Sequence, residues 1–153
     1  IPPRSASSMK KRNTWLSLLI LVLAGGFIGY KVWNKPHKEV RSADAVPATA
    51  IQLYQAFTSD SVKARQRYTN KILAVSGSIT RISENGQQQQ VVMLQTATDG
   101  ASINCTMEEK ATGLREGQPV TIKGICSGYM EGDADMGLPG DVFLVRCYYI
   151  PEK

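Results

Sequence analysis

The residue types that catalysis requires are present in this chain, but they do not form a recognisable catalytic set. The 153-residue sequence holds one histidine, His37, in a polar stretch that begins with Pro36. Serine and aspartate are plentiful, but the sequence offers no base to activate a nucleophile. We therefore predict that the protein is not an enzyme, and we expect no catalytic residue and no cofactor.

An acidic run between residues 130 and 140 has the alternating carboxylates of a calcium loop. Glu131, Asp133 and Asp135 occupy alternate positions in EGDADMG. A calcium loop also needs glycine at its sixth position and glutamate at its twelfth, and counting from Glu131 gives neither. We expect a solvated acidic loop and no metal site.

Cys105, Cys126 and Cys147 are the remaining reactive groups, and each falls in a stretch with strand-like alternation. None belongs to a C-x-x-C motif or to a zinc spacing. Two strand cysteines in a small domain favour a disulfide and an oxidising compartment, with one thiol left over. The alternative is three buried thiols that pack as small apolar side chains in a cytosolic domain.

An apolar segment near the N-terminus is long enough to anchor the chain in a membrane. Residues 14–33, TWLSLLILVLAGGFIGYKVW, hold no charge before Lys31, and about 20 such residues cross a bilayer core. We predict a single uncleaved transmembrane span. A cleaved signal peptide is the alternative, although Lys31 and Trp33 follow where small residues are needed. A lipid anchor is disfavoured because LAGG has glycine where a lipoprotein signal has cysteine.

Basic charge is concentrated around this segment and just after it. Residues 1–70 hold 11 Lys and Arg against 3 Asp and Glu, whereas residues 71–153 hold 7 against 10. These basic flanks could contact anionic lipid headgroups. Because they are balanced across the span, the positive-inside rule does not orient it, and the cysteines favour a C-terminal domain outside the cytoplasm. Within the basic tail, residues 1–13, those before Met9 are expected to be an upstream extension.

The rest of the chain divides into a tether, a helical segment and strands. Residues 34–47 are polar and contain prolines, as a tether does. Residues 48–70 repeat apolar side chains at helical spacing, with a break at TSDS, and we predict that they pack on the following domain rather than forming a free amphipathic arm. From there the period changes to two, which predicts strands at 71–83, 89–96, 101–107, 119–129 and 141–150.

Five strands with one interruption, between the third and the fourth, describe a small closed barrel. Asn85-Gly86 predicts a hairpin turn after the first strand, and Thr98–Gly100 predicts another after the second. The fold class is therefore mainly β, a five-stranded oligonucleotide/oligosaccharide-binding (OB) barrel over residues 71–153, preceded by one transmembrane helix and a short helical segment. A five-stranded meander or another barrel topology is the alternative.

Four runs in this order carry a family resemblance: YTNKILAVSGSI, INCTM, LREGQPVTIKGICSGY and DVFLVRC. They resemble the tRNA-anticodon-binding-like (tRNA_anti-like) family of OB-fold proteins, most specifically in Lys-Gly-x-Cys-x-Gly-Tyr at residues 123–129. The resemblance implies a small bacterial protein of the kind often carried behind an N-terminal membrane anchor. It brings no catalytic residue and no demonstrated nucleic-acid ligand. Residues 130–140 form a longer connection than the motif suggests.

In such a barrel, the glycines and cysteines of the strands have structural roles. Gly77, Gly124 and Gly128 are expected to let the strands bend and bulge, which closes the barrel. If the fourth and fifth strands pair antiparallel, Cys126 and Cys147 could face each other in a disulfide worth about 2 to 4 kcal/mol. Pairing of Cys105 with Cys147 is the second choice.

The second and third predicted strands lack the groups that bind nucleic acid. An OB fold that binds single strands offers aromatic platforms and a basic groove there, but residues 89–96 and 101–107 contain no aromatic residue, Lys or Arg. The possible ligand contacts are isolated: Arg81, Lys123, Tyr129 and Arg146. We predict a membrane-anchored, non-catalytic binding module of unknown ligand. The alternative is a protein-interaction or scaffolding subunit of a cell-envelope complex, and nucleic-acid binding is disfavoured.

Overall fold

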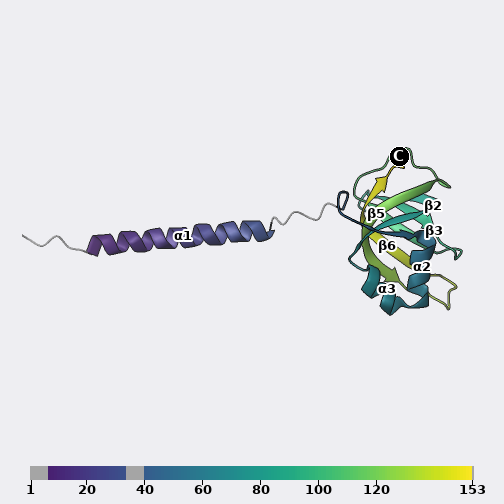
Figure 1. The fold of residues 1–153 in the computed structure, drawn as a ribbon, viewed down its shortest axis with the longest axis horizontal. Coiled ribbons are helices and arrows are strands. Elements are labelled where there is room, and N and C mark those ends of the chain that lie inside the picture. Colours follow the sequence, from purple (N-terminus) through teal and green to yellow (C-terminus); the bar gives the residue numbers. More distant parts are fainter. Residues whose placement is uncertain (1–6, 34–39, 153) are drawn as a thin grey trace, which may run out of the picture. The chain divides into compact units, whose positions relative to one another are not determined.

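The structure, a computed structural model, describes residues 7–33 and 40–152, and the chain forms two compact units, Ile1–His37 and Lys38–Lys153. The first unit contains one helix, α1 (Ser7–Trp33) (Figure 1). Its residues Asn13–Tyr30 have a mean hydropathy of 1.6 and none of them is buried. By length and composition α1 could cross a membrane, a test that signal sequences also pass. Residues 1–6 of the predicted tail and residues 34–39 of the predicted tether lie outside the described residues.

Two short helices precede the barrel, and their caps explain where they begin and end. Helix α2 (Ala50–Ser59) begins with a capping box, in which Thr49 and Gln52 each accept a hydrogen bond from the other's backbone N–H. Asp60 ends α2 and caps α3 (Ser61–Tyr68), because its Oδ1 accepts the Lys63 N–H at 3.1 Å. The predicted break at TSDS is therefore a single non-helical residue between two helices.

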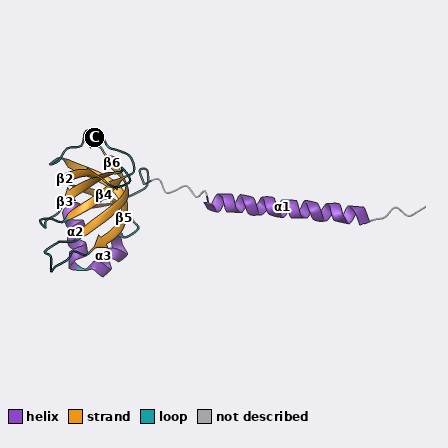
Figure 2. Ribbon diagram, turned by 180° about the vertical axis from the view of Figure 1, so that it is seen from behind, coloured by secondary structure: helices purple, strands orange, loops and turns teal. Residues whose placement is uncertain are grey.

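Five strands form a closed barrel, and they occur along the chain where the sequence predicted them. The strands are β2 (Ile72–Glu84), β3 (Gln90–Gln95), β4 (Ser102–Met107), β5 (Pro119–Met130) and β6 (Asp141–Ile150). The order β2-β3-β4-β6-β5 closes because β2 also pairs with β5, and only the β4–β6 pair within this ring is parallel. The OB-barrel prediction is confirmed (Figures 1 and 2).

Strand β2 is long because it pairs with two different strands along its length. Its first half, Ile72–Ser78, pairs with β5, and its second half, from Ile79 onward, pairs with β3 after a bulge. A short strand that the sequence did not predict, β1 (Val46–Thr49), runs parallel to the first half. It covers the backbone edge that β3 leaves open.

The two ends of the barrel are covered by different segments. Helices α2 and α3 lie at one end, opposite the C-terminus (Figure 1), where Leu53 and Phe57 enter the core. The connection between β4 and β5 lies at the other end, where β4 and β6 both finish, and its Ala111 and Leu114 pack against the same core. We refer to these as the helical end and the connection end.

The three cysteines are free, buried thiols, so the predicted Cys126–Cys147 disulfide is not formed. The register of β5 and β6 explains this correction, because Cys126 pairs with Leu144 and not with Cys147. The Cys147 sulfur instead lies against Gly124, where a Cβ atom would overlap it. Glycine at 124 therefore makes room for a thiol.

Burial keeps these thiols protonated. Burial raises the pKa of Cys126 to about 11. A hydrogen bond with Cys105 raises the pKa of Cys147 well above its usual value, and burial adds to the effect. A thiol is nucleophilic as the thiolate, so neither group is reactive at neutral pH in the folded barrel.

The other two barrel glycines meet different demands. Gly128 follows one of the two register shifts between β5 and β6 and has φ 141°, which disfavours any other residue. Gly77 lies under α2, where a Cβ atom would sit 2.9 Å from the Cβ of Ala50. Bulging thus accounts for Gly128, and close approach of a helix accounts for Gly77.

Candidate functional site

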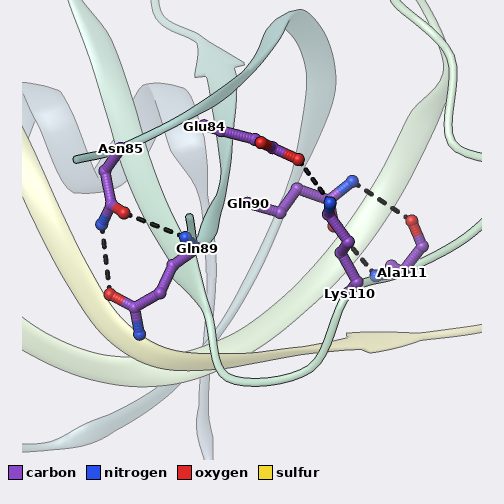
Figure 3. Close-up of polar contacts among 6 residues, drawn as sticks. All are labelled: Glu84, Asn85, Gln89, Gln90, Lys110 and Ala111. Carbon is purple, nitrogen blue, oxygen red and sulfur yellow. Dashed lines mark hydrogen bonds and ion pairs between the residues drawn. The ribbon is translucent and has the colours of Figure 1, made fainter. Parts of the chain in front are cut away.

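The connection end of the barrel is closed by polar groups that satisfy one another (Figure 3). The Gln90 side chain accepts the Ala111 N–H at 2.9 Å and donates to the Ala111 carbonyl at 3.2 Å. An ion pair between Lys110 and Glu84 lies beside it. Together these contacts fasten the β2–β3 hairpin to the β4–β5 connection.

The β2–β3 turn uses its own side chains in the same way. Asn85 Oδ1 accepts the N–H groups of Gln87 and Gln89, and Asn85 Nδ2 donates to Gln89 Oε1 at 3.1 Å (Figure 3). Its left-handed residue is Gln88, with φ 62°, so the turn spans more than the predicted Asn85-Gly86 pair. The side chains of Asn85, Gln89 and Gln90 are thus engaged within the protein.

The helical end is built from aromatic side chains. Phe57 stacks on Tyr129 with ring centroids 5.8 Å apart, and Tyr54 meets the same ring edge-on at 6.2 Å. Burial, together with a hydrogen bond to Tyr129, raises the pKa of Tyr54. Tyr129, predicted as a possible ligand contact, thus points toward the helices and braces them against the end of β5.

The β5–β6 loop, residues 131–140, is an ordered hairpin held by Asp133. Its Oδ1 accepts the N–H groups of Asp135 and Met136 at 3.0 and 3.2 Å, and its carbonyl accepts the Leu138 N–H at 2.9 Å. Asp133 is therefore committed to holding the loop. The described residues contain no group of three or more His, Cys, Asp or Glu that could hold a metal ion.

This loop presents large apolar side chains to solvent. Met130 is 65% exposed, Met136 is 68% exposed and Leu138 is 56% exposed. Burying a side chain of this size from water is worth about 1.5 to 3 kcal/mol. Met136 and Leu138 of the loop, with Met130 at the end of β5, are therefore a candidate contact surface.

A row of outward side chains on the barrel wall continues this surface. Met93, Asn104 and Phe143 are neighbours across β3, β4 and β6, and Arg81 stands beside Met93 on β2. Asn104 faces outward but is only 7% exposed, and its Oδ1 accepts a hydrogen bond from the Ser102 hydroxyl at 3.4 Å. In OB folds the face of the second and third barrel strands, here β3 and β4, is where ligands bind.

Two hollows meet at the end of β5, and they differ in chemistry. The Phe143 hollow, of about 250 Å³, has an apolar and aromatic lining, made of Ser127, Gly128, Tyr129, Met130 and Phe143. The acidic hollow, of about 460 Å³, has two carboxylates and an aromatic floor, made of Phe57, Thr58, Ser59, Asp60, Ser61, Tyr129 and Glu131. Both hollows include Tyr129, so they lie side by side.

The structure does not gather the four predicted contact residues into one site. Arg81 lies at the edge of the barrel-wall row, and Tyr129 separates the two hollows. Lys123 lies elsewhere on β5 and donates to the Arg41 carbonyl at 3.2 Å. Arg146 is exposed on β6 with φ 52°, beside the bulge between β4 and β6.

The residues that make this surface were mostly missed from the sequence. Met130, Met136 and Leu138 were read as part of a solvated acidic loop, and Asp60 only as part of a helix break. Two features of the sequence could have indicated the apolar residues: the length of the segment between β5 and β6, and the apolar side chains within it. Phe143 could have been found from alternation, since Val142 and Leu144 on either side of it are buried.

Comparison with known proteins found similar solved structures and one matching family model. Among solved structures, a "putative nucleic acid-binding lipoprotein" from Klebsiella pneumoniae subsp. pneumoniae is 20% identical, with a TM-score of 0.48 over 76% of this chain and 100% of that one. A "putative aspartyl-tRNA synthetase" from Leishmania major Friedlin is 8% identical, with a TM-score of 0.40 over 78% of this chain and 22% of that one.

An OBody bound to hen egg-white lysozyme is 15% identical, with a TM-score of 0.34 over 57% of this chain and 82% of that one. No curated protein matches. The model of the tRNA_anti-like family matches residues 9–136, which is more than half of the sequence. The chain therefore belongs to the tRNA_anti-like family.

Proposed function

We propose that this protein is a membrane-anchored, non-catalytic binding module whose barrel binds a protein partner at the helical end. The observation that carries the proposal is the group of exposed apolar side chains at this end, Met130 at the edge of the Phe143 hollow and Met136 and Leu138 in the β5–β6 loop. A polar small ligand would be held by convergent polar groups, whereas this surface offers apolar area. We therefore favour the alternative that the sequence left open, a subunit that interacts with another protein.

Charge argues against nucleic acid at the same surface. Glu131 and Asp135 project from the loop, and Glu131 has no ion-pair partner among the residues described. Phosphate binding depends on clustered Lys and Arg, but Arg81 is the single cation in the barrel-wall row. A phosphate backbone would meet carboxylates here.

The anchor is α1, whose apolar side chains are exposed all along Asn13–Tyr30. It would hold the barrel at a membrane surface. With no disulfide, the cysteines give no support for an oxidising compartment, so placement of the barrel outside the cytoplasm stays a prediction. Carbonate extraction tests the anchor: the full chain should remain with the membrane pellet, and release into the supernatant would contradict an anchor.

Site-specific photo-crosslinking in the native membrane tests the binding face. A photoreactive residue at position 130 should give a discrete adduct that Phe143→Ser weakens. The same residue at position 51 is the control, because Ile51 is 46% exposed on α2 and lines neither hollow. Equal adducts from positions 130 and 51 would remove the case for this site.

A further inference from the structure

The two hollows at the end of β5 differ enough to specify what the partner must present. The Phe143 hollow is bounded by Met130 and by the Phe143 ring, with a glycine at 128 that leaves its floor open. A single apolar side chain resting in this shallow hollow would cover Met130 and the Phe143 ring. Burial of one such side chain gives a partner most of its anchoring free energy.

The acidic hollow requires the opposite chemistry. Its two charged residues are Asp60, at the α2–α3 junction, and Glu131, the first residue of the loop. Asp60 is partly neutralised, because Lys63 Nζ lies 3.5 Å from its Oδ2, but Lys63 is itself highly exposed. Tyr129 supplies aromatic surface next to these carboxylates, and the buried Phe57 stacks on its ring. Carboxylates beside an aromatic ring suit a Lys or Arg side chain.

The two hollows are close together along the chain, which limits the distance between the apolar and the basic side chain of a partner. Met130 lines the Phe143 hollow and Glu131, the next residue, lines the acidic hollow. Consecutive Cα atoms are about 3.8 Å apart, and an extended chain advances about 3.3 Å per residue. A short segment lying across Tyr129 would reach both hollows, and we take about one to three residues as the separation of the two side chains that enter them.

We propose that the helical end binds a polypeptide segment with an apolar side chain in the Phe143 hollow and a Lys or Arg within about three residues of it in the acidic hollow. This inference rests on the proposed function and names the chemistry of the partner. The exposed Met136 and Leu138 of the ordered loop extend the apolar contact beyond the anchor.

Selection from a displayed library of random ten-residue peptides provides the test, with the full chain in nanodiscs and with empty nanodiscs as the counter-selection. Enriched peptides should share an apolar residue with Lys or Arg within three positions. Met130→Ser should weaken a selected peptide at least about tenfold, because an apolar wall of its anchor site is lost. The pair Asp60→Asn and Glu131→Gln should weaken it about fivefold at low salt, and this difference should shrink in about 1 M salt.

The variants are chosen to keep the fold. Asparagine caps a helix as well as aspartate does, so Asp60→Asn removes the charge and keeps the start of α3. Ile51→Ser and Glu116→Gln are the matched controls, since both residues are exposed and lie outside both hollows. Neither should change the affinity.

Three results overturn the inference: no enrichment over empty nanodiscs, enriched peptides without a basic residue, or binding that the hollow variants leave unchanged. If the peptides fail while position 130 still gives a discrete adduct in the membrane, the face binds a partner of other chemistry and the proposed function stands. If both fail, the site itself is wrong.

Discussion

The two hairpins at opposite ends of this barrel are built on different principles. At the connection end, Gln90 and Asn85 satisfy backbone and side-chain groups of neighbouring segments, and the hairpin is fastened to the chain around Ala111. At the helical end, Asp133 holds the tip of the β5–β6 hairpin and Asp141 ties its base to Ser102, while Met136 and Leu138 stay in water. The polar side chains of the β2–β3 hairpin form hydrogen bonds within the protein. The β5–β6 hairpin has a defined fold although its large apolar side chains are not buried. The difference separates the end that is closed by its own polar contacts from the end that we propose binds a partner.

The largest effect is expected from breaking the aromatic support under the binding end. Phe57 is 1% exposed and contacts both Tyr129 and Tyr68, so Phe57→Ala should lower the free energy of unfolding by about 3 to 5 kcal/mol. Urea unfolding followed by near-ultraviolet circular dichroism of the tyrosines measures this. Ile51→Ala, an exposed change on the same helix, is the control. A loss below about 1 kcal/mol for Phe57→Ala would mean that the helices do not brace this end.

The free energy of unfolding should fall at alkaline pH because of the buried thiols in the barrel strands. In the unfolded chain Cys126 has an ordinary thiol pKa of 9.0, whereas burial in the folded barrel raises its pKa to about 11. Stability is therefore full below pH 9 and should fall between pH 9 and pH 11, by up to about 1.4 kcal/mol per pH unit for this thiol. Urea unfolding at stepped pH tests this, and Cys126→Ala should flatten the profile.

Alkylation without a reductant tests the thiols directly. All three cysteines should react in urea, and the native protein at pH 8 should react slowly because its thiols are buried. A linked pair of peptides containing Cys126 and Cys147 in the mass map would restore the disulfide that the sequence predicted.

A smaller effect is expected at the connection end. Gln90→Ala removes two hydrogen bonds to the Ala111 backbone and should cost about 1 to 3 kcal/mol of stability. Lys110→Ala breaks only an exposed ion pair and should cost about 1 kcal/mol or less. The two variants are compared by urea unfolding. Equal losses would show that the ion pair contributes as much to the stability of this end as the Gln90 hydrogen bonds do.

Alternation and turn residues predicted most of the fold. All five barrel strands lie within one or two residues of the predicted ranges, and the helix break falls at Asp60. Strand β1 was missed because its four residues include Pro47 and carry no alternation; it forms only because β2 offers an open edge. The disulfide was mispredicted because antiparallel pairing alone does not give the register, which places Cys126 opposite Leu144 and the Cys147 sulfur against Gly124.

The site was far less predictable, since it depends on which apolar residues stay outside. Sequence pattern cannot distinguish a buried Leu138 from an exposed one, because exposure follows from how Asp133 folds the loop. Tyr129 was singled out, but its inward orientation follows from the bulge at Gly128. The acidic hollow joins Asp60 to Glu131, residues far apart in the chain that only the packing of α2 and α3 brings together.

The smallest effect on stability should come from the β5–β6 loop itself. Met136→Ser and Leu138→Ser replace side chains that are already in water, so each should change the free energy of unfolding by about 0.5 kcal/mol or less. If the loop is a contact surface, the same pair should weaken the adduct formed from position 130 in the membrane. Ile51→Ser is the matched control and should leave both measurements unchanged. A stability loss above about 1.5 kcal/mol would show that these side chains pack against the barrel, and an unchanged adduct would restrict the contact surface to the two hollows.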